Sequence, residues 1–239
     1  KHPLADFEDQ GRIRQETMEL WRSTFGDPEE FIQLYFSRVY RSEYNVCCQL
    51  DGRVVAALQT LPYPCCTRGR EVNTAYISGV AVMESYRGHD IGNNLMRQAH
   101  FRLYYKDTVF ASLIPAEAWL YGWYGKCGYA EVITCKPAPA DPMAVSFADF
   151  DRIQRAKNCV LLHDEDGYGV IRDDIRLAGE AYRPQMEDIP AMLRVSTRRS
   201  FAPLRRYTPR HRHGAPCRRG CRHTDEQRIL CAERRNCAP

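Results

Sequence analysis

The stretch from Tyr76 to Phe101 constrains the fold more than any other part of the chain. Its first seven residues, Tyr76 to Val82, alternate small and β-branched side chains and stop at a polar break, which is typical of a strand. A turn between Arg87 and Gly92 follows, and apolar residues then recur at helical spacing. A turn that opens a helix directly after a strand directs free backbone N–H groups at one point, together with the positive end of the helix dipole. That point suits a phosphate group.

An aromatic segment follows the helix at a distance. Residues 109–114 form a short apolar run that predicts a buried strand. Residues 119–127 predict an aromatic helix, with Gly128 as its C-terminal stop, and residues 129–135 predict a returning strand.

Together these two segments resemble the acetyl-CoA-binding core of the GCN5-related N-acetyltransferases (GNAT). That family has an Arg/Gln-x-x-Gly-x-Gly/Ala turn after its fourth strand, followed later by an aromatic-Tyr-x-x-x-Gly-aromatic helix. This chain has Arg87 and Gly92, and then the run Trp123 to Tyr129. The closest likeness is to the enhanced-intracellular-survival (Eis) type, which shares the Tyr-Gly-x-x-Gly-Tyr form of the second motif. The resemblance covers about residues 10–135 and fades through about residue 195.

The resemblance implies where acetyl-CoA, the expected acetyl donor, would bind. The turn would hold its diphosphate through Arg87, Gly88, His89, Asp90, Ile91, Gly92 and Asn93. The strand residues Val80, Ala81 and Val82 would pair with the pantetheine arm through main-chain atoms, one N–H polarising the thioester carbonyl. The alternative is that the side chains of these residues only pack within the sheet. No metal site is expected.

Tyr124 is the expected catalytic residue. In many members of the family the matching tyrosine protonates the thiolate that leaves when an amine attacks the thioester. The surrounding aromatic residues also favour a packing role for this segment. The general base is left open between Glu117, Glu84 and a water chain. The Eis-type resemblance implies a C-terminal carboxylate presented by the last domain, but no trace of that domain is visible here, so the role is not carried over to Pro239.

The expected fold class is α/β (α+β), an acyltransferase fold with a mixed, mostly antiparallel sheet flanked by helices. Residues 13–25 and 31–39 predict two helices, the second starting at a capping Asp27 followed by Pro28, with Phe31, Leu34, Tyr35 and Val39 as its apolar stripe. Residues 44–50 and 53–61 predict a hairpin around Asp51-Gly52, which leads into a long strand from about residue 71.

The predicted division places an acetyltransferase domain at residues 1–135 and a linker at 136–142, where Pro and Ala dominate. Residues 143–195 are interpreted as a partial second GNAT-like unit, because about fifty residues stand where a full copy needs about twice as many. The Eis-type resemblance also implies a sterol-carrier-like third domain, of which no trace is visible.

The segment from Ser196 to Pro239 differs in composition from the rest. It holds 12 arginines, no lysine and three acids, a net charge of +9, whereas the remainder carries −5 of the total of +4. Its few apolar residues predict disorder, and the sharp change at Val195 suggests an out-of-frame translation. The Cys and His spacing there does not match a standard zinc site, and without stacking aromatics the arginines favour non-specific contacts over specific nucleic-acid binding.

The favoured function is acetyl transfer from acetyl-CoA to a primary amine of a small molecule or protein. The alternative is a degenerate, non-catalytic module that binds CoA or a partner, and a third reading is a basic nucleic-acid-binding protein. The eleven cysteines include adjacent pairs and are interpreted as reduced thiols. With no long apolar run, a cytoplasmic location and no membrane partner are expected; formation of a homo-oligomer is left open.

Asp90 stands where the family has a glycine. Asp tolerates left-handed backbone angles, but its carboxylate would lie near the expected diphosphate, and like charges at short range repel. We therefore predict that Asp90→Gly tightens acetyl-CoA binding in a calorimetric titration. Equal affinities of the two proteins would refute this prediction.

Overall fold

The structure, a computed structural model, describes residues 3–135, 141–179 and 189–195. Its helices are α1 (Pro3–Phe25), α2 (Glu29–Leu34), α3 (Ile91–Tyr105), α4 (Ala118–Lys126), α5 (Phe147–Arg155) and α6 (Glu165–Ala178). Its strands are β1 (Asn45–Leu50), β2 (Arg53–Leu61), β3 (Cys65–Thr67), β4 (Arg70–Val72), β5 (Thr74–Val82), β6 (Phe110–Leu113), β7 (Ala130–Cys135), β8 (Cys159–Leu161) and β9 (Ile189–Val195).

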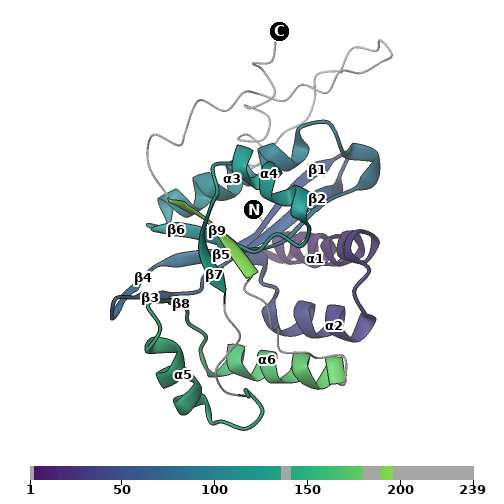
Figure 1. Cartoon of the computed structure of the whole chain (residues 1–239). Helices are drawn as coiled ribbons and strands as arrows, with labels where there is room; N and C mark the ends of the chain where they lie inside the picture. The colour runs from purple at the N-terminus through teal and green to yellow at the C-terminus, as the bar shows by residue number, and fades with distance from the viewer. Residues whose placement is uncertain (1–2, 136–140, 180–188, 196–239) are drawn as a thin grey trace, which may run out of the picture.

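A six-stranded sheet in the order β1-β2-β5-β6-β9-β7 forms the central layer, and a three-stranded sheet, β4-β3-β8, lies beside it (Figure 1). Every pair of neighbours is antiparallel except β5 and β6, which are parallel. The expected mixed, mostly antiparallel sheet flanked by helices is confirmed. The predicted long strand is interrupted at Asn73, so that β4 joins the small sheet and β5 the large one.

The β1–β2 hairpin forms where the sequence places it. Asp51 and Gly52 connect the strands with φ of +50° and +79°, and Leu50 faces Arg53 across the turn. Positive φ at both central residues matches the right-handed twist of the flanking strands.

A β-bulge bends β5 at Gly79. The β2–β5 register shifts between Ala57 and Gln59, and Gly79 has a φ of +62°. A Cβ atom at this glycine would lie 2.1 Å from the Trp21 ring of α1, so the strand can approach the helix only without a side chain here. Because a bulge increases local twist and turns the strand, β5 changes direction at this point.

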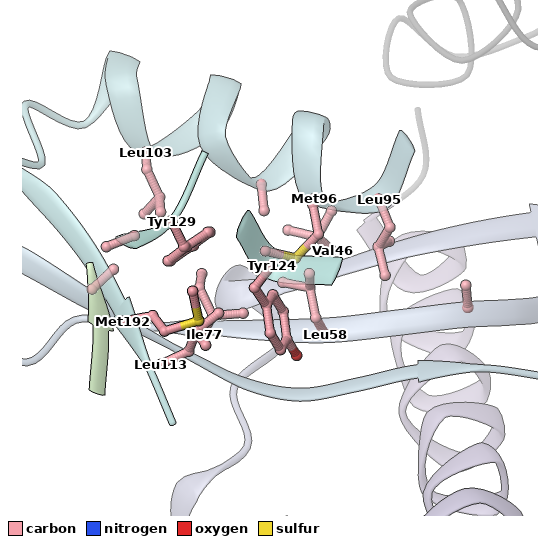
Figure 2. Packing of buried hydrophobic residues seen from close by; sticks show 14 of the residues in the cluster. Val46, Leu58, Ile77, Leu95, Met96, Leu103, Leu113, Tyr124, Tyr129 and Met192 are labelled. Carbon is pink, nitrogen blue, oxygen red and sulfur yellow. The ribbon is translucent and has the colours of Figure 1, made fainter. Parts of the chain in front are cut away.

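Helices cover both faces of the large sheet (Figure 1). On one face α3 and α4 bury the main apolar cluster, shown in Figure 2 with Leu58 and Ile77 of the sheet beneath Leu95, Met96 and Leu103 of α3. On the other face Leu20 of α1 packs on Val54, Ala57 and Ala81. A third cluster joins α1 to the α2 region through Met18, Trp21, Ile32, Tyr35, Phe36 and Tyr40.

The start of α2 differs from the prediction. Asp27 does not cap the helix; the N-cap is Pro28, without a side-chain hydrogen bond, and the Asp27 carboxylate accepts a 2.7 Å hydrogen bond from Trp21 Nε1. Of the predicted apolar stripe, Tyr35 is buried and Phe31 and Val39 pack against the same cluster. Ile32 and Phe36, which the prediction did not include, are buried as well. The chain from Tyr35 to Val39 is π-helical.

Residues after 141 contact the preceding part of the chain. β8 pairs with β3, and β9 lies between β6 and β7 in the large sheet. Helix α6 packs near α2, where Arg38 forms ion pairs with Asp166 at 2.6 Å and Asp173 at 3.2 Å. The division into a domain, a linker and a partial second unit stays a prediction, and most of the linker and the whole basic tail lie outside the described residues.

Gly79→Ala should destabilise the protein, because the added methyl group meets the packed Trp21 ring and the backbone is in a left-handed conformation. We expect a loss of roughly 2–4 kcal/mol in the free energy of unfolding, measured by urea denaturation.

The matched control is Gly11→Ala, in the exposed part of α1 with no atom within 4 Å of the added carbon. It should be neutral or stabilising by up to about 1 kcal/mol, through helix propensity alone. Similar losses in both variants would show that the bulge does not require glycine.

Candidate functional site

The strands β5 and β6 part in the middle of the large sheet. They pair only from Thr74↔Phe110 to Tyr76↔Ser112, whereas β5 continues to Val82 alongside β2. Within the described residues, the β5 edge from Ile77 to Val82 therefore has no strand partner on the β6 side. Unpaired main-chain groups on such an edge can bind an extended ligand as an added strand would.

The three predicted strand residues lie on this parted segment. Ala81 is buried, in the cluster beneath α1, whereas Val80 and Val82 are half-buried and pack against the main cluster. Their side chains thus pack in the core, as the packing alternative expects, and only their main-chain atoms are available to a ligand.

The turn after β5 leaves the N-terminus of α3 open. Gly88 and Asp90 have φ of +79° and +61°, and Asp90 is the N-cap, without a side-chain capping bond. The first bond into the helix is Asn94 N–H to the Asp90 carbonyl, at 3.0 Å. Among the described residues no acceptor meets the N–H groups of residues 91–93, which are the groups a helix offers to an anion.

The remaining turn residues have separate local roles. Arg87 donates from Nε to the Val82 carbonyl at 3.1 Å, and the Arg87 carbonyl lies 2.9 Å from His89 Nδ1. Ile91 is buried in the core, and a Cβ at Gly92 would lie 3.1 Å from the Trp123 ring. Gly92 thus packs closely against the aromatic helix, whereas Arg87, Gly88, His89 and Asp90 are exposed.

Asp90 is paired, which the sequence analysis did not anticipate. Its carboxylate accepts hydrogen bonds from Asn93 Nδ2 at 2.6 Å and from Arg97 Nη2 at 3.2 Å. The Cys127 thiol of α4 in turn donates to Asn93 Oδ1 at 3.5 Å. Arg97 escaped notice, although its i+7 spacing from Asp90, two helical turns, was a signal for one shared face.

Tyr124 lies in the main cluster, only 7% exposed. Figure 2 shows its ring pointing away from α3 toward the strands of the sheet. Edge-on aromatic contacts with Trp123 and Tyr129, at centroid distances of 4.7 and 5.9 Å, fix its orientation. Burial, followed by the nearby Cys127 and Tyr76, raises the pKa of Tyr124 well above its usual value. The phenol therefore stays protonated at neutral pH, the state required of an acid.

No general base emerges from the two carboxylates considered. Glu84 and Glu117 are both exposed, and Glu117 accepts a 2.6 Å hydrogen bond from Trp119 Nε1. In the described part of the chain, no group of three or more His, Cys, Asp or Glu side chains is arranged to hold a metal ion. None of the described helices is long and apolar enough to cross a membrane.

A buried polar pair joins α3 to the residue just before β7, the strand after the aromatic helix. His100 Nε2 is 2.9 Å from the Tyr129 hydroxyl, and both residues are at most 4% exposed. Burial, followed by the charge of Arg194, lowers the pKa of His100 to about 3. Arg194 comes from β9, and its Nε would lie 3.1 Å from a Cβ at Gly128, so the late strand contacts the end of the aromatic motif.

The parted strands, the open helix terminus and the aromatic helix occur together in one mixed, mostly antiparallel α/β fold. The chain belongs to the acetyltransferase (GNAT) domain family, whose model matches residues 13–132.

Several solved structures are similar to the chain. Eis1 from Mycobacterium abscessus is similar with a TM-score of 0.54 and 12% identity, over 70% of this chain and 46% of that one. A probable N-acyltransferase from Enterococcus faecalis matches with a TM-score of 0.44 and 19% identity, and the 51% of this chain that aligns spans 30% of that protein. An acetyltransferase of Brucella melitensis in complex with acetyl-CoA matches with a TM-score of 0.40 and 19% identity, over 54% and 79% of the two chains. No curated protein matches the chain significantly.

The depressed pKa of His100 predicts a pH-dependent stability. Between about 6.5 and about 3 the unfolded histidine binds a proton that the folded one excludes, so stability is complete above this window and falls as the pH is lowered through it. The slope contributed by one group is at most about 1.4 kcal/mol per pH unit.

We expect His100→Gln to flatten this slope in denaturation curves taken from pH 7 to pH 4. The exposed His89→Gln variant serves as the control and should keep the slope of the original protein. If the two variants behave alike, His100 is not the group responsible.

Proposed function

We propose that this chain transfers an acetyl group from acetyl-CoA to a primary amine of a small molecule or protein. The observation that carries the proposal is the parting of β5 from β6 beside the uncapped N-terminus of α3. An unpaired strand edge, a helix end with free N–H groups and the buried phenol of Tyr124 are the features that support it. Membership of the GNAT family supports acetyl-CoA as the donor.

The turn from Arg87 to Asn93 would bind the diphosphate. The N–H groups of residues 91–93 and the helix dipole favour an anion at this end of α3. Gly88 lets the turn adopt its left-handed conformation with no side chain nearby. These features fit the diphosphate of the donor. The terminal nitrogens of Arg87 would add charge, since only its Nε is engaged by Val82.

The β5 edge would hold the pantetheine arm. Main-chain groups between Ile77 and Val82 would pair with the amides of the arm, as in strand addition. A backbone N–H there would also stabilise negative charge developing on the thioester oxygen during attack.

Tyr124 would supply the proton. As the amine nitrogen attacks the carbonyl carbon, the C–N bond forms and the C–S bond breaks, and the phenol protonates the departing thiolate. The phenol is protonated at neutral pH, as a proton donor must be. The attacking nitrogen becomes positively charged in the tetrahedral intermediate and loses a proton to a base that the described residues do not identify; a proton returned to Tyr124 completes the cycle.

The second candidate is a module that binds CoA or a partner without turnover. The observation that favours it is the carboxylate of Asp90 in the phosphate-binding turn, 51% exposed. Release of free thiol from acetyl-CoA with a panel of polyamines and aminoglycosides separates the two. Amine-dependent release supports the enzyme, whereas CoA binding without release supports the module.

Tyr124→Phe should lower kcat by roughly 100-fold, because the proton donor is lost, while the Kd for acetyl-CoA stays within about twofold, because the ring remains. The assays are thiol release and calorimetric titration. Tyr121→Phe, on the same helix and packed against the same cluster, is the control and should keep its activity. Equal kcat in the original protein and Tyr124→Phe would remove the tyrosine from the mechanism.

A further inference from the structure

The side chain of Arg97 reaches back to the N-cap residue of α3. It lies on the second turn of the helix, and helical side chains lean toward the N-terminus. Its Nη2 reaches the Asp90 carboxylate at 3.2 Å and also donates to Asn94 Oδ1. The guanidinium is therefore bonded to the N-cap residue of α3, the helix whose N–H groups of residues 91–93 lack acceptors in the described chain.

This position does not suit a purely structural ion pair. A cation near the positive end of a helix is unfavourable, and the pair is exposed, with 37% of the Arg97 side chain and 51% of the Asp90 side chain accessible, so it adds little stability. Arg97 Nε is in addition buried without an acceptor, although an arginine has five donors to satisfy. The guanidinium thus keeps hydrogen-bonding capacity that the described residues do not satisfy.

The carboxylate of Asp90 is itself shared. It accepts from Asn93 Nδ2 at 2.6 Å as well as from Arg97. When Arg97 moves away, Asn93 still satisfies one oxygen, and Asn93 is fixed from the other side by the Cys127 thiol. The Asp90–Arg97 bond, the longer of the two, can therefore open without leaving Asp90 unpaired.

We propose that Arg97 binds the diphosphate of coenzyme A and that Asp90 holds it at the turn in the absence of the donor. This inference rests on the proposed function. Two phosphate groups attract the guanidinium more strongly than one carboxylate and accept a bidentate pair of hydrogen bonds. Arg97 thus turns from Asp90 to the ligand. The negative charge of Asp90, at a position where the family has glycine, is offset by the positive charge of Arg97.

The competing explanation is that Arg97 only neutralises Asp90. A double-mutant cycle separates the two, with CoA affinity measured by calorimetry at low salt. We expect Arg97→Gln to weaken CoA binding roughly tenfold, both in the original protein and in the Asp90→Asn background, because the lost contact is to the ligand. Asp90→Asn alone should tighten binding severalfold, since it removes the repelling charge and releases Arg97. An Arg97→Gln effect that vanishes in the Asp90→Asn background would overturn the proposal.

Three ligands locate the contact. Dephospho-CoA keeps the diphosphate and should show the same dependence on Arg97 as CoA, whereas pantetheine, which lacks it, should show none. A dependence that disappears with dephospho-CoA would place Arg97 at the 3′-phosphate and refute the assignment. Arg102→Gln, on the same helix and bonded to the Asn45 carbonyl at 2.8 Å, controls for the loss of one positive charge and should bind CoA unchanged.

Inorganic pyrophosphate makes the inference separable from the proposed function. If pyrophosphate binds in an Arg97-dependent manner while CoA does not bind at all, the anion site is supported and the donor role falls. If CoA binds equally well to the original protein and to both Arg97→Gln variants, the donor role stands and this inference falls. Thermal unfolding of each variant shows whether a loss of binding reflects a loss of fold.

Discussion

The contact of Trp21 with Gly79 joins helix α1 to strand β5. The indole is tilted against Tyr35 with ring centroids 4.4 Å apart, meets Phe36 edge-on at 5.8 Å, and donates from Nε1 to Asp27. It thereby fixes the path of the chain from α1 into α2, and it reaches β5 only because Gly79 has no side chain. The same glycine forms the bulge, so one close approach both anchors helix α1 on the sheet and turns the strand within its unpaired edge. Because side chains pack tightly on both faces of the sheet, the path of β5 at Gly79 is strongly constrained.

Local signals explain what the sequence predicted well. The Asp51-Gly52 hairpin, the strand from Tyr76, the helix from Ile91 and the aromatic helix before Gly128 each depend on residues close together in the chain. Turn chemistry and apolar spacing specify such elements directly. The left-handed backbone of Asp90 follows from the same reasoning and is present at a φ of +61°.

Long-range contacts explain what the sequence missed. Asp27 reads as a helix cap, but the indole of Trp21, six residues earlier, competes for its carboxylate. The π-helical turn from Tyr35 packs against α1, and the apolar spacing of its own residues does not indicate it. Arg97 lies within a helix that was predicted, but its direction toward Asp90 depends on rotamers that spacing alone does not define. The pairing of β9 with β6 and β7 joins residues more than fifty positions apart, and no local pattern announces it.

The position of β9 has a consequence for how the chain acquires its fold during synthesis. In the described sheet β7 has β9 as its one neighbour, and β9 is also what connects β7 to β6. The residues matched by the family model end at 132, before the strand that completes the sheet has been made. A nascent chain that has emerged only to the aromatic helix therefore exposes the edge of β6, a surface prone to wrong pairing. The time needed to synthesise the chain from β7 to β9 therefore sets how long the sheet remains incomplete.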